Sequence, residues 1–170
     1  MVTKVEGGPI ARQDDRLGEL ELLYRESAVR LARAIYAFSG GRRQVAEDAV
    51  AEAFARAIAH RDSIRVPLAW IYRTAFRIAS RELQREHRSL AAPPDPVPGI
   101  DPAEVFEVLR ALAILSPNQR AAVVLHDEEG MSTREVADAL GMAPATVRVH
   151  LFRGRHRLRT LLGVEENPDE

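Results

Sequence analysis

The sequence contains no cysteine, and aromatic residues make up only 5% of its 170 residues. The absence of cysteine excludes disulfides, thiolate zinc sites and cysteine nucleophiles, and it fits a protein of the reducing cytosol. Residues 1–15 lack the apolar core of a signal peptide, and no stretch approaches the length of a membrane span. We therefore expect a soluble, cytoplasmic protein that does not bind membranes.

Sustained alternation of apolar and polar residues is also missing, so nothing in the sequence favours β-strands. Alanine and arginine are frequent, with 26 alanines in the chain, and both favour helix. Apolar residues at helical spacing predict helices over about 14–38, 44–60, 68–88 and 103–115, and a further helix that starts at Ser116. The fold class is therefore expected to be all-α.

The sequence carries no recognisable catalytic site. It has no glycine-rich phosphate loop, no nucleophile elbow and no plausible pair of carboxylates. Residues 126–129, His-Asp-Glu-Glu, are adjacent, so they would fan outwards at a helix end, and we expect a surface turn there. We expect no enzymatic activity, no cofactor, no metal and no small-molecule substrate.

Residues 132–162 have the pattern of a helix-turn-helix. Ser132 and Glu135 form a capping-box start, and Gly141 suits the left-handed conformation that ends a helix. Pro144 then stands at the first position of a second helix. Two short helices joined by so short a turn are typical of DNA-binding proteins, although an ordinary helical hairpin has the same outline.

The second helix of this motif is basic. Residues 143–162 carry five arginines and no acidic residue. A helix of this kind suits the major groove, with its N-terminal side chains at base edges and its arginines on phosphates. The predicted DNA contacts are Ala145, Thr146, Arg148, Val149, Arg153 and Arg155.

A second basic island lies near the middle of the chain. The net charge is −1, but residues 61–88 carry +4 and residues 143–162 carry +5, so the remainder is acidic at −10. Four arginines in the first island follow one another at i,i+4 spacing, where like charges repel. Three aromatic residues lie among them, which is a pattern that holds unpaired bases, although at least one of the three is expected in the core. These arginines are Arg73, Arg77, Arg81 and Arg85, and the aromatic residues are Trp70, Tyr72 and Phe76.

Residues 89–102 contain five of the ten prolines and cannot be helical throughout. We interpret them as a linker between two small domains, residues 14–88 and 103–163. Residues 1–13 are expected to form a disordered tail, and residues 164–170 an acidic one.

Both halves, in this order, resemble a bacterial RNA polymerase sigma factor of the extracytoplasmic-function type. The first half resembles sigma region two in LLYRESAVRLARAIYAFSG, AEDAVAEAFARAIAH and AWIYRTAFRIASREL. The second half resembles sigma region four over residues 115–162. The resemblance covers residues 17–162 and implies a bacterial transcription initiation factor whose partners are core RNA polymerase, promoter DNA and an anti-sigma factor.

The resemblance also implies roles for individual residues. Asp48, Glu52 and Phe54 match the segment that grips the polymerase. The helix that begins at Pro144 matches the one that reads the minus-thirty-five duplex. The loop at residues 60–66 and the helix after it match the part that holds the opened minus-ten strand, here through His60, Arg61, Arg65, Trp70, Arg73 and Arg77.

A free-standing helix-turn-helix repressor or activator is the alternative. Such a protein would need a symmetric dimer on a two-fold operator. The arginine row and the proline-rich linker argue against it.

Overall fold

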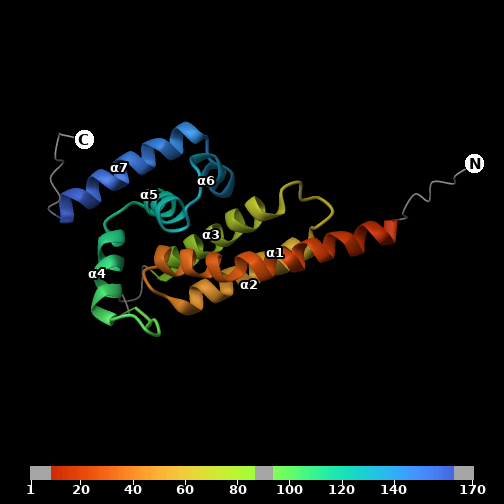
Figure 1. Cartoon of the computed structure of the whole chain (residues 1–170), viewed down its shortest axis with the longest axis horizontal. Coiled ribbons are helices and arrows are strands. Elements are labelled where there is room, and N and C mark those ends of the chain that lie inside the picture. The colour runs from red at the N-terminus through yellow and green to blue at the C-terminus, as the bar shows by residue number, and fades with distance from the viewer. Residues whose placement is uncertain (1–8, 87–93, 163–170) are drawn as a thin grey trace, which may run out of the picture.

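The computed structural model describes residues 9–86 and 94–162, which form seven α-helices and one π-helical turn and contain no strand (Figure 1). The predicted all-α class is confirmed. No helix among these residues is both long enough and apolar enough to cross a membrane. We refer below to residues 9–86 as the N-terminal half and to residues 94–162 as the C-terminal half.

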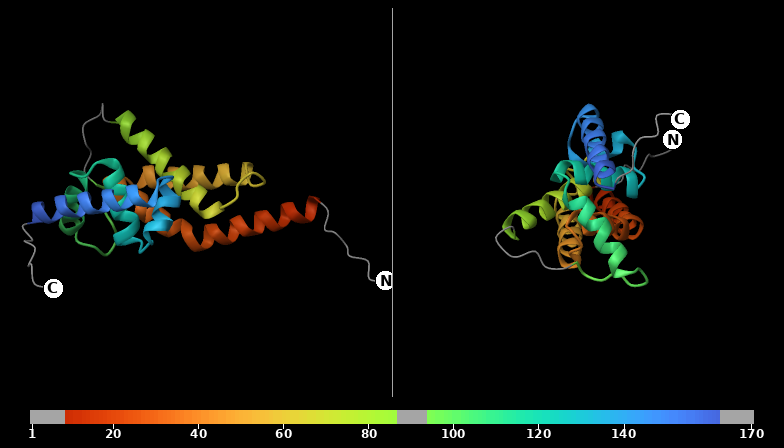
Figure 2. Two further views of the ribbon diagram at one scale, coloured as in Figure 1. Left: turned by 90° about the horizontal axis from the view of Figure 1, so that it is seen from above. Right: turned by 90° about the vertical axis from the view of Figure 1, so that its left-hand side faces the viewer.

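The N-terminal half is a bundle of three helices, α1 (Pro9–Phe38), α2 (Arg43–Ala59) and α3 (Pro67–Glu86), which lie side by side in Figures 1 and 2. Alanines at the helix contacts, among them Ala49, Ala53 and Ala75, are fully buried and allow close approach. Helix α1 begins before the predicted Asp14, so the tail predicted over residues 1–13 was placed too far into the chain. Residues 1–8 and the predicted acidic tail lie outside the described residues.

Two glycines end α1 and also fix the path of the predicted linker. Gly40 and Gly41 have φ angles of 75° and 86°, which side chains rarely tolerate. A Cβ on Gly41 would collide with Pro94 and with the side chain of Leu109. The close approach of residue 94 to this turn therefore requires glycine.

Asp95 fastens the described end of the predicted linker to the same turn. Its amide donates to the carbonyl of Gly41 at 2.8 Å, and its carboxylate accepts from the amide of Arg43 at 2.7 Å. Its carbonyl accepts from the hydroxyl of Tyr36, whose pKa is raised by burial and by the Asp95 charge. The chain from Pro94 is thus held against the α1–α2 turn, while residues 87–93 lie outside the described residues.

The C-terminal half begins with α4 (Pro102–Ala113), which stands at one end of the bundle. It continues with α5 (Pro117–Val123), the π-helical turn η1 (Val124–Glu128), α6 (Thr133–Leu140) and α7 (Pro144–Leu162). Asp101 caps α4, and a capping box of Ser116 and Gln119 starts α5. The helices α5, α6 and α7 lie along one side of the N-terminal bundle (Figures 1 and 2).

The turn η1 corrects the prediction for residues 126–129. After Val123 the helix widens, so that the amide of Glu129 donates to the carbonyl of Val124 at 3.1 Å. This turn directs Glu129 inwards, where its side chain is only 3% exposed and pairs with Arg30 of α1. Of the four residues only Glu129 departs from the predicted surface turn, since Asp127 and Glu128 are exposed and His126 is partly exposed. In the described part of the chain, no group of three or more histidine, aspartate or glutamate side chains could hold a metal ion.

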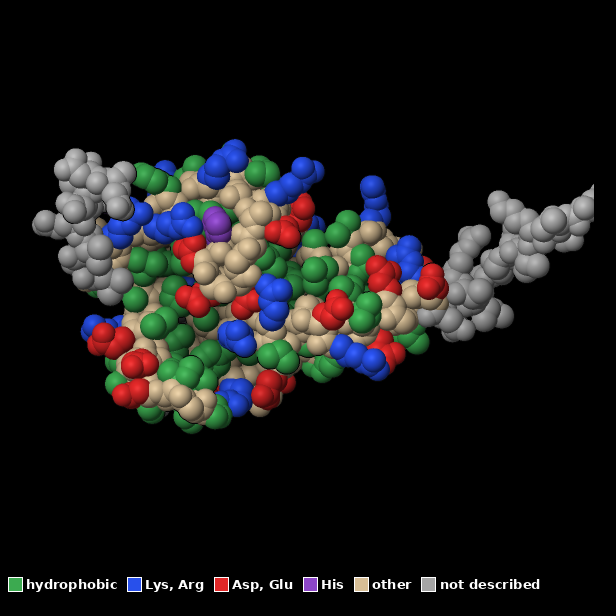
Figure 3. All heavy atoms as spheres, in the orientation of Figure 1, with side chains coloured by type: hydrophobic (Ala, Val, Ile, Leu, Met, Phe, Trp, Pro, Cys, Tyr) green, Lys and Arg blue, Asp and Glu red, His purple; other side chains and the backbone are tan. Residues whose placement is uncertain are grey.

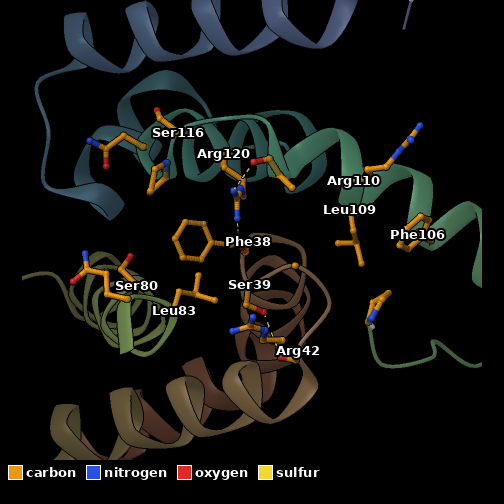
Figure 4. A pocket seen from close by; sticks show the side chains of 16 residues that line it. Phe38, Ser39, Arg42, Ser80, Leu83, Phe106, Leu109, Arg110, Ser116 and Arg120 are labelled. Carbon is orange, nitrogen blue, oxygen red and sulfur yellow. Dashed lines mark hydrogen bonds between the residues drawn. The ribbon is translucent and has the colours of Figure 1, made fainter. Parts of the chain in front are cut away.

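One continuous apolar core joins the two halves. It includes Leu31, Ile35 and Phe38 of α1 together with Leu125 and Val136 of the C-terminal half. Beside this core lies a cavity of about 1020 Å³. Figure 4 shows its lining, to which α1, α3, α4 and α5 all contribute.

Arg120 of α5 ties these elements together through carbonyl oxygens. Its guanidinium donates to Leu112 at 2.9 Å and to Phe38, on the other half, at 3.0 Å, with longer bonds to Ala113 and Leu115. The bond to Phe38 is drawn in Figure 4. Burial lowers the pKa of Arg120. Removal of this side chain would leave several carbonyls without a donor.

We predict that Arg120→Ala lowers the free energy of unfolding by about 2–3 kcal/mol, since bonds to a charged donor contribute roughly 1.5–3 kcal/mol. Arg110→Ala is the matched control, because Arg110 lines the same cavity and is exposed. Its effect should stay within about 0.5 kcal/mol. Urea denaturation followed by circular dichroism measures both changes. Equal losses for the two variants would contradict the role given to Arg120.

Candidate nucleic-acid interface

The helix-turn-helix forms as its sequence predicts. The hydroxyl of Ser132 accepts from the amide of Glu135 at 3.2 Å, and the Glu135 carboxylate accepts from the amide of Ser132 at 2.8 Å. These bonds lower the pKa of Glu135. At the other end of α6, Gly141 adopts the left-handed conformation with φ of 68°. The start of α6 and the turn that follows it are therefore confirmed.

Packing of α7 decides which of its faces is left for a ligand. Val147 is fully buried beside α6, and Leu151 is buried one turn later. Gly154 lies so close to α5 that a Cβ there would be 3.0 Å from Cγ2 of Val123. With this face held against α5 and α6, the opposite face of α7 points outwards.

The predicted base-reading residues lie on that outward face. Ala145, Thr146, Arg148 and Val149 are all exposed, as is Arg153. In Figure 3, arginine side chains lie along the edge formed by α7, while acidic side chains gather on α4. The exposed residues share one face and can approach a groove together.

The same face includes a residue that the sequence reasoning missed. Phe152 is 75% exposed, which is unusual for a phenyl ring on a well-packed helix. Phe152 lies between the buried Leu151 and the exposed Arg153, and helical periodicity places it on the outward face of α7. Its exposure could therefore have been predicted from the sequence.

Arg155 differs from the other predicted contacts. Its guanidinium forms a two-pronged ion pair with the carboxylate of Asp127 in η1, and it is partly covered. Hydrogen bonding to Asp127 raises the pKa of Arg155. A phosphate contact through Arg155 stays a prediction, and it would compete with this intramolecular pair.

The four arginines of the second predicted site, on α3, are all exposed. Arg77 and Arg81 are exposed, and Arg85 pairs with Glu82 at 3.3 Å. Arg73 is exposed as well, and its guanidinium donates to the carbonyl of Asp138 in α6 at 2.7 Å. The N-terminal end of this row of arginines therefore contacts α6, whereas Arg85 at its C-terminal end pairs within α3.

Of the aromatic residues on α3, two belong to the core. Tyr72 and Phe76 are buried, and Phe76 makes an edge-on contact with Phe38 at 5.0 Å between ring centres. Trp70 is half-buried. Trp70 is therefore the aromatic side chain of α3 that remains within reach of a base.

The loop at residues 60–66 is fixed by two interactions at its base. Ile64 is buried, and Arg16 of α1 donates to the carbonyls of Arg61 and Ile64. His60 and Arg65 project into solvent, whereas Arg61 is partly buried and donates to the carbonyl of Ile58 at 2.9 Å. The loop thus presents His60 and Arg65 near the start of α3.

The three residues predicted to contact polymerase also differ in their exposure to solvent. Asp48 and Glu52 are exposed on one face of α2, where Glu52 pairs with Arg56 at 2.6 Å. Phe54 is only 5% exposed and packs edge-on against Tyr24 with 5.0 Å between ring centres. Phe54 has a packing role in this structure, and a polymerase contact through its side chain stays a prediction.

Comparisons with known proteins agree with the geometry. Residues 106–158 match the family described as sigma-70, region 4. SigE of Mycolicibacterium smegmatis, an ECF RNA polymerase sigma factor, is 33% identical over 155 residues, which are 82% of this chain and 60% of SigE. The chain belongs to the extracytoplasmic-function sigma factors. SigM of Mycobacterium tuberculosis, another member, is 36% identical over 129 residues, which are 69% of this chain and 64% of SigM.

Solved structures support the fold of this sigma factor. The sigma factor RpoE from Bartonella quintana, crystallised with the anti-sigma factor NepR, aligns with a TM-score of 0.68 and 24% identity, over 87% of this chain and 99% of RpoE. CnrH in complex with the cytosolic domain of CnrY aligns with a TM-score of 0.65 and 26% identity, over 86% of this chain and 89% of CnrH. The chain spans 60% and 64% of the length of SigE and SigM.

We predict that Arg148 reads a base edge and that Arg153 contacts phosphate. Arg148→Ala should cost about 1–3 kcal/mol and relax the preference at one base pair, while Arg153→Ala should weaken all sequences alike and reduce the salt slope by about 1. Binding selection from a randomised duplex library, repeated at several salt concentrations, measures both effects. Arg33→Ala, an exposed arginine on α1, is the control. Equal, sequence-independent losses for Arg148→Ala and Arg153→Ala would refute this division of roles.

Proposed function

We propose that this chain is a transcription initiation factor that binds core RNA polymerase and directs it to specific promoters. The observation that carries the proposal is the presence, in one member of the sigma family, of two separate arginine-rich faces with different geometry. One is the outward face of α7, and the other is the exposed part of α3 beside the loop at residues 60–66. The two faces suit two forms of DNA.

The outward face of α7 suits duplex DNA at the minus-thirty-five element. A rigid helix fits the major groove, where Arg148 and Thr146 would reach base edges and Arg153 would reach a phosphate. Ala145 and Val149 supply apolar contact of the kind that recognises a thymine methyl group. These residues form the proposed duplex-reading surface.

The α3 face suits the opened strand of the minus-ten element. His60, Arg65 and Arg77 would track the backbone, and Trp70 offers a ring for stacking. Opening costs about 1.4 kcal/mol per base-pair step, and each captured base can return roughly 1–3 kcal/mol. Capture of a few bases is therefore enough to stabilise an opened segment.

Contact with polymerase is assigned to the acidic face of α2. Asp48 and Glu52 are exposed four residues apart, so they lie on one side of the helix. The division of the chain into a strand-reading domain (residues 14–88) and a duplex-reading domain (residues 103–163) belongs to the same proposal. In this view polymerase supplies the chemistry, and the chain itself catalyses no reaction.

Regulation by a partner protein is a further part of the proposal. RpoE of Bartonella quintana was crystallised with an anti-sigma factor, and RpoE shares the fold of this chain. We propose that an anti-sigma factor binds this chain as well, and that both act in the bacterial cytoplasm.

We predict that the free chain binds promoter duplex weakly at physiological salt and that core polymerase is needed for tight binding. A single recognition helix makes few phosphate contacts, and the chain outside the two basic islands carries −10. Core polymerase would make the second DNA contact intramolecular. Gel shifts and run-off transcription of a candidate promoter, with and without core polymerase, measure this dependence. A tight specific complex of the chain alone, with no transcript on addition of core polymerase, would favour a free-standing regulator.

A further inference from the structure

The cavity beside the apolar core has no part in the functions described so far. Its volume of about 1020 Å³ lies at the upper end of the roughly 300–1,000 Å³ that ligand pockets occupy. The helices α1 and α3 of the N-terminal half and α4 and α5 of the C-terminal half all border it (Figure 4). None of the predicted DNA or polymerase contacts is among the described residues that line it. A ligand in the cavity would therefore leave both DNA-reading surfaces free.

Apolar side chains from both halves line the cavity. Phe38 at the end of α1 and Leu109 in α4 are buried, and Leu83 of α3 is partly buried. These three side chains point into the same space in Figure 4. Phe106 of α4 also lines the cavity, and its phenyl ring is 53% exposed. A concave apolar wall with an exposed ring at its edge favours a ligand that has an apolar part.

The charged side chains that line the cavity all carry positive charge. They are Arg42, Arg110 and Arg120, and no aspartate or glutamate is among the described residues of the lining, although the chain has 25 acidic residues. Glu104 and Glu107 of α4 are exposed and lie outside the lining. An apolar wall bordered by cations alone is complementary to a ligand that has both an apolar part and a negative charge.

Arg120 carries a partly buried charge without a counter-ion. Its guanidinium donates to carbonyl oxygens, and within the described residues it forms no ion pair with a carboxylate. The carbonyls satisfy its N–H groups but do not neutralise its charge, and desolvation of that charge lowers the pKa of Arg120. Figure 4 shows its side chain reaching from α5 into the space next to Phe38. An anion in the cavity would supply the missing partner.

We propose that this cavity binds an amphiphilic anion, a small molecule with one carboxylate or sulfonate and an aliphatic or aromatic tail. The negative group lies towards Arg42 and Arg120. The tail lies against Phe38, Phe106 and Leu109. This site does not rest on the proposed function and adds a small-molecule ligand to it, which the chain binds and does not convert. Because the ligand contacts both halves, its binding raises the melting temperature of the chain.

The first experiment tests whether the full-length chain selects an amphiphilic anion. The probe is anilinonaphthalene sulfonate, whose fluorescence rises when it leaves water. Decanoate and decanol have the same apolar tail and differ in charge, so each is used to displace the probe. Decanoate should displace it at about tenfold lower concentration than decanol, because a hydrogen bond to a charged group is roughly twice as strong as a neutral one.

A matched pair of α4 variants locates the site. Phe106 and Val108 are exposed to a similar extent, at 53% and 55%, but of the two only Phe106 lines the cavity. Phe106→Glu removes the ring and adds a negative charge, so it should weaken probe binding about tenfold or more. Val108→Glu adds the same charge outside the cavity and should leave probe binding within about twofold. Thermal melting checks that both variants are folded.

A second set of variants tests the charge of the lining. Arg42→Gln should weaken displacement by decanoate and leave displacement by decanol unchanged. Arg42→Lys keeps the positive charge and should retain the preference for decanoate. Arg33→Gln is the control, because Arg33 is exposed on α1 and lies outside the lining.

The outcomes decide between an anion site and a purely apolar surface. Saturable probe binding, preferential displacement by decanoate and loss of binding in folded Phe106→Glu chains support the site. Equal displacement by decanoate and decanol would indicate a surface for an apolar protein segment and overturns the proposal. Equal weakening by Phe106→Glu and Val108→Glu, or absence of saturable binding, overturns it as well. Promoter-directed transcription with core polymerase does not depend on this site, so the proposed function stands or fails separately.

Discussion

The structure depends on one apolar core that continues from the three-helix bundle into the helix-turn-helix half. Without it, η1 and α6 would expose Val124, Leu125 and Val136, which are fully buried. The polar contacts at the boundary act on top of this core. Burial of apolar side chains attracts the two halves but does not fix their orientation. Arg30, Arg73 and Arg120 fix it, because each donates hydrogen bonds to specific acceptors on the opposite half or across a turn.

Features that depend on neighbouring residues could be predicted from the sequence. The capping boxes at Ser116 and Ser132, the left-handed Gly141 and the helical start at Pro144 each involve residues a few positions apart. Helix boundaries agree within a few residues for the same reason, except at the start of α1. Exposure of Thr146 and Arg148 followed from the helical period once Val147 was placed in the core.

Features that depend on distant residues could not be predicted. The inward turn of Glu129 has meaning only with Arg30, which is 99 positions away. The burial of Phe54 depends on Tyr24, and the engagement of Arg73 depends on Asp138. The proline-rich segment gave no sign that Asp95 would bind the α1–α2 turn. In each case the local sequence pattern was compatible with two environments, and contacts with distant residues determined which of them formed.

The central claim is that one apolar core holds the two DNA-reading surfaces in a fixed arrangement in the free chain, and that core polymerase, as the proposed function requires, spaces them for two promoter elements. Pulsed electron spin resonance measures this directly, with spin labels on Leu22→Cys in α1 and Thr160→Cys in α7, both exposed positions in a chain without cysteine. The account predicts one narrow distance distribution for the free chain and a clear displacement on addition of core polymerase. A broad distribution in the free chain, or the same narrow distribution with and without polymerase, would contradict it.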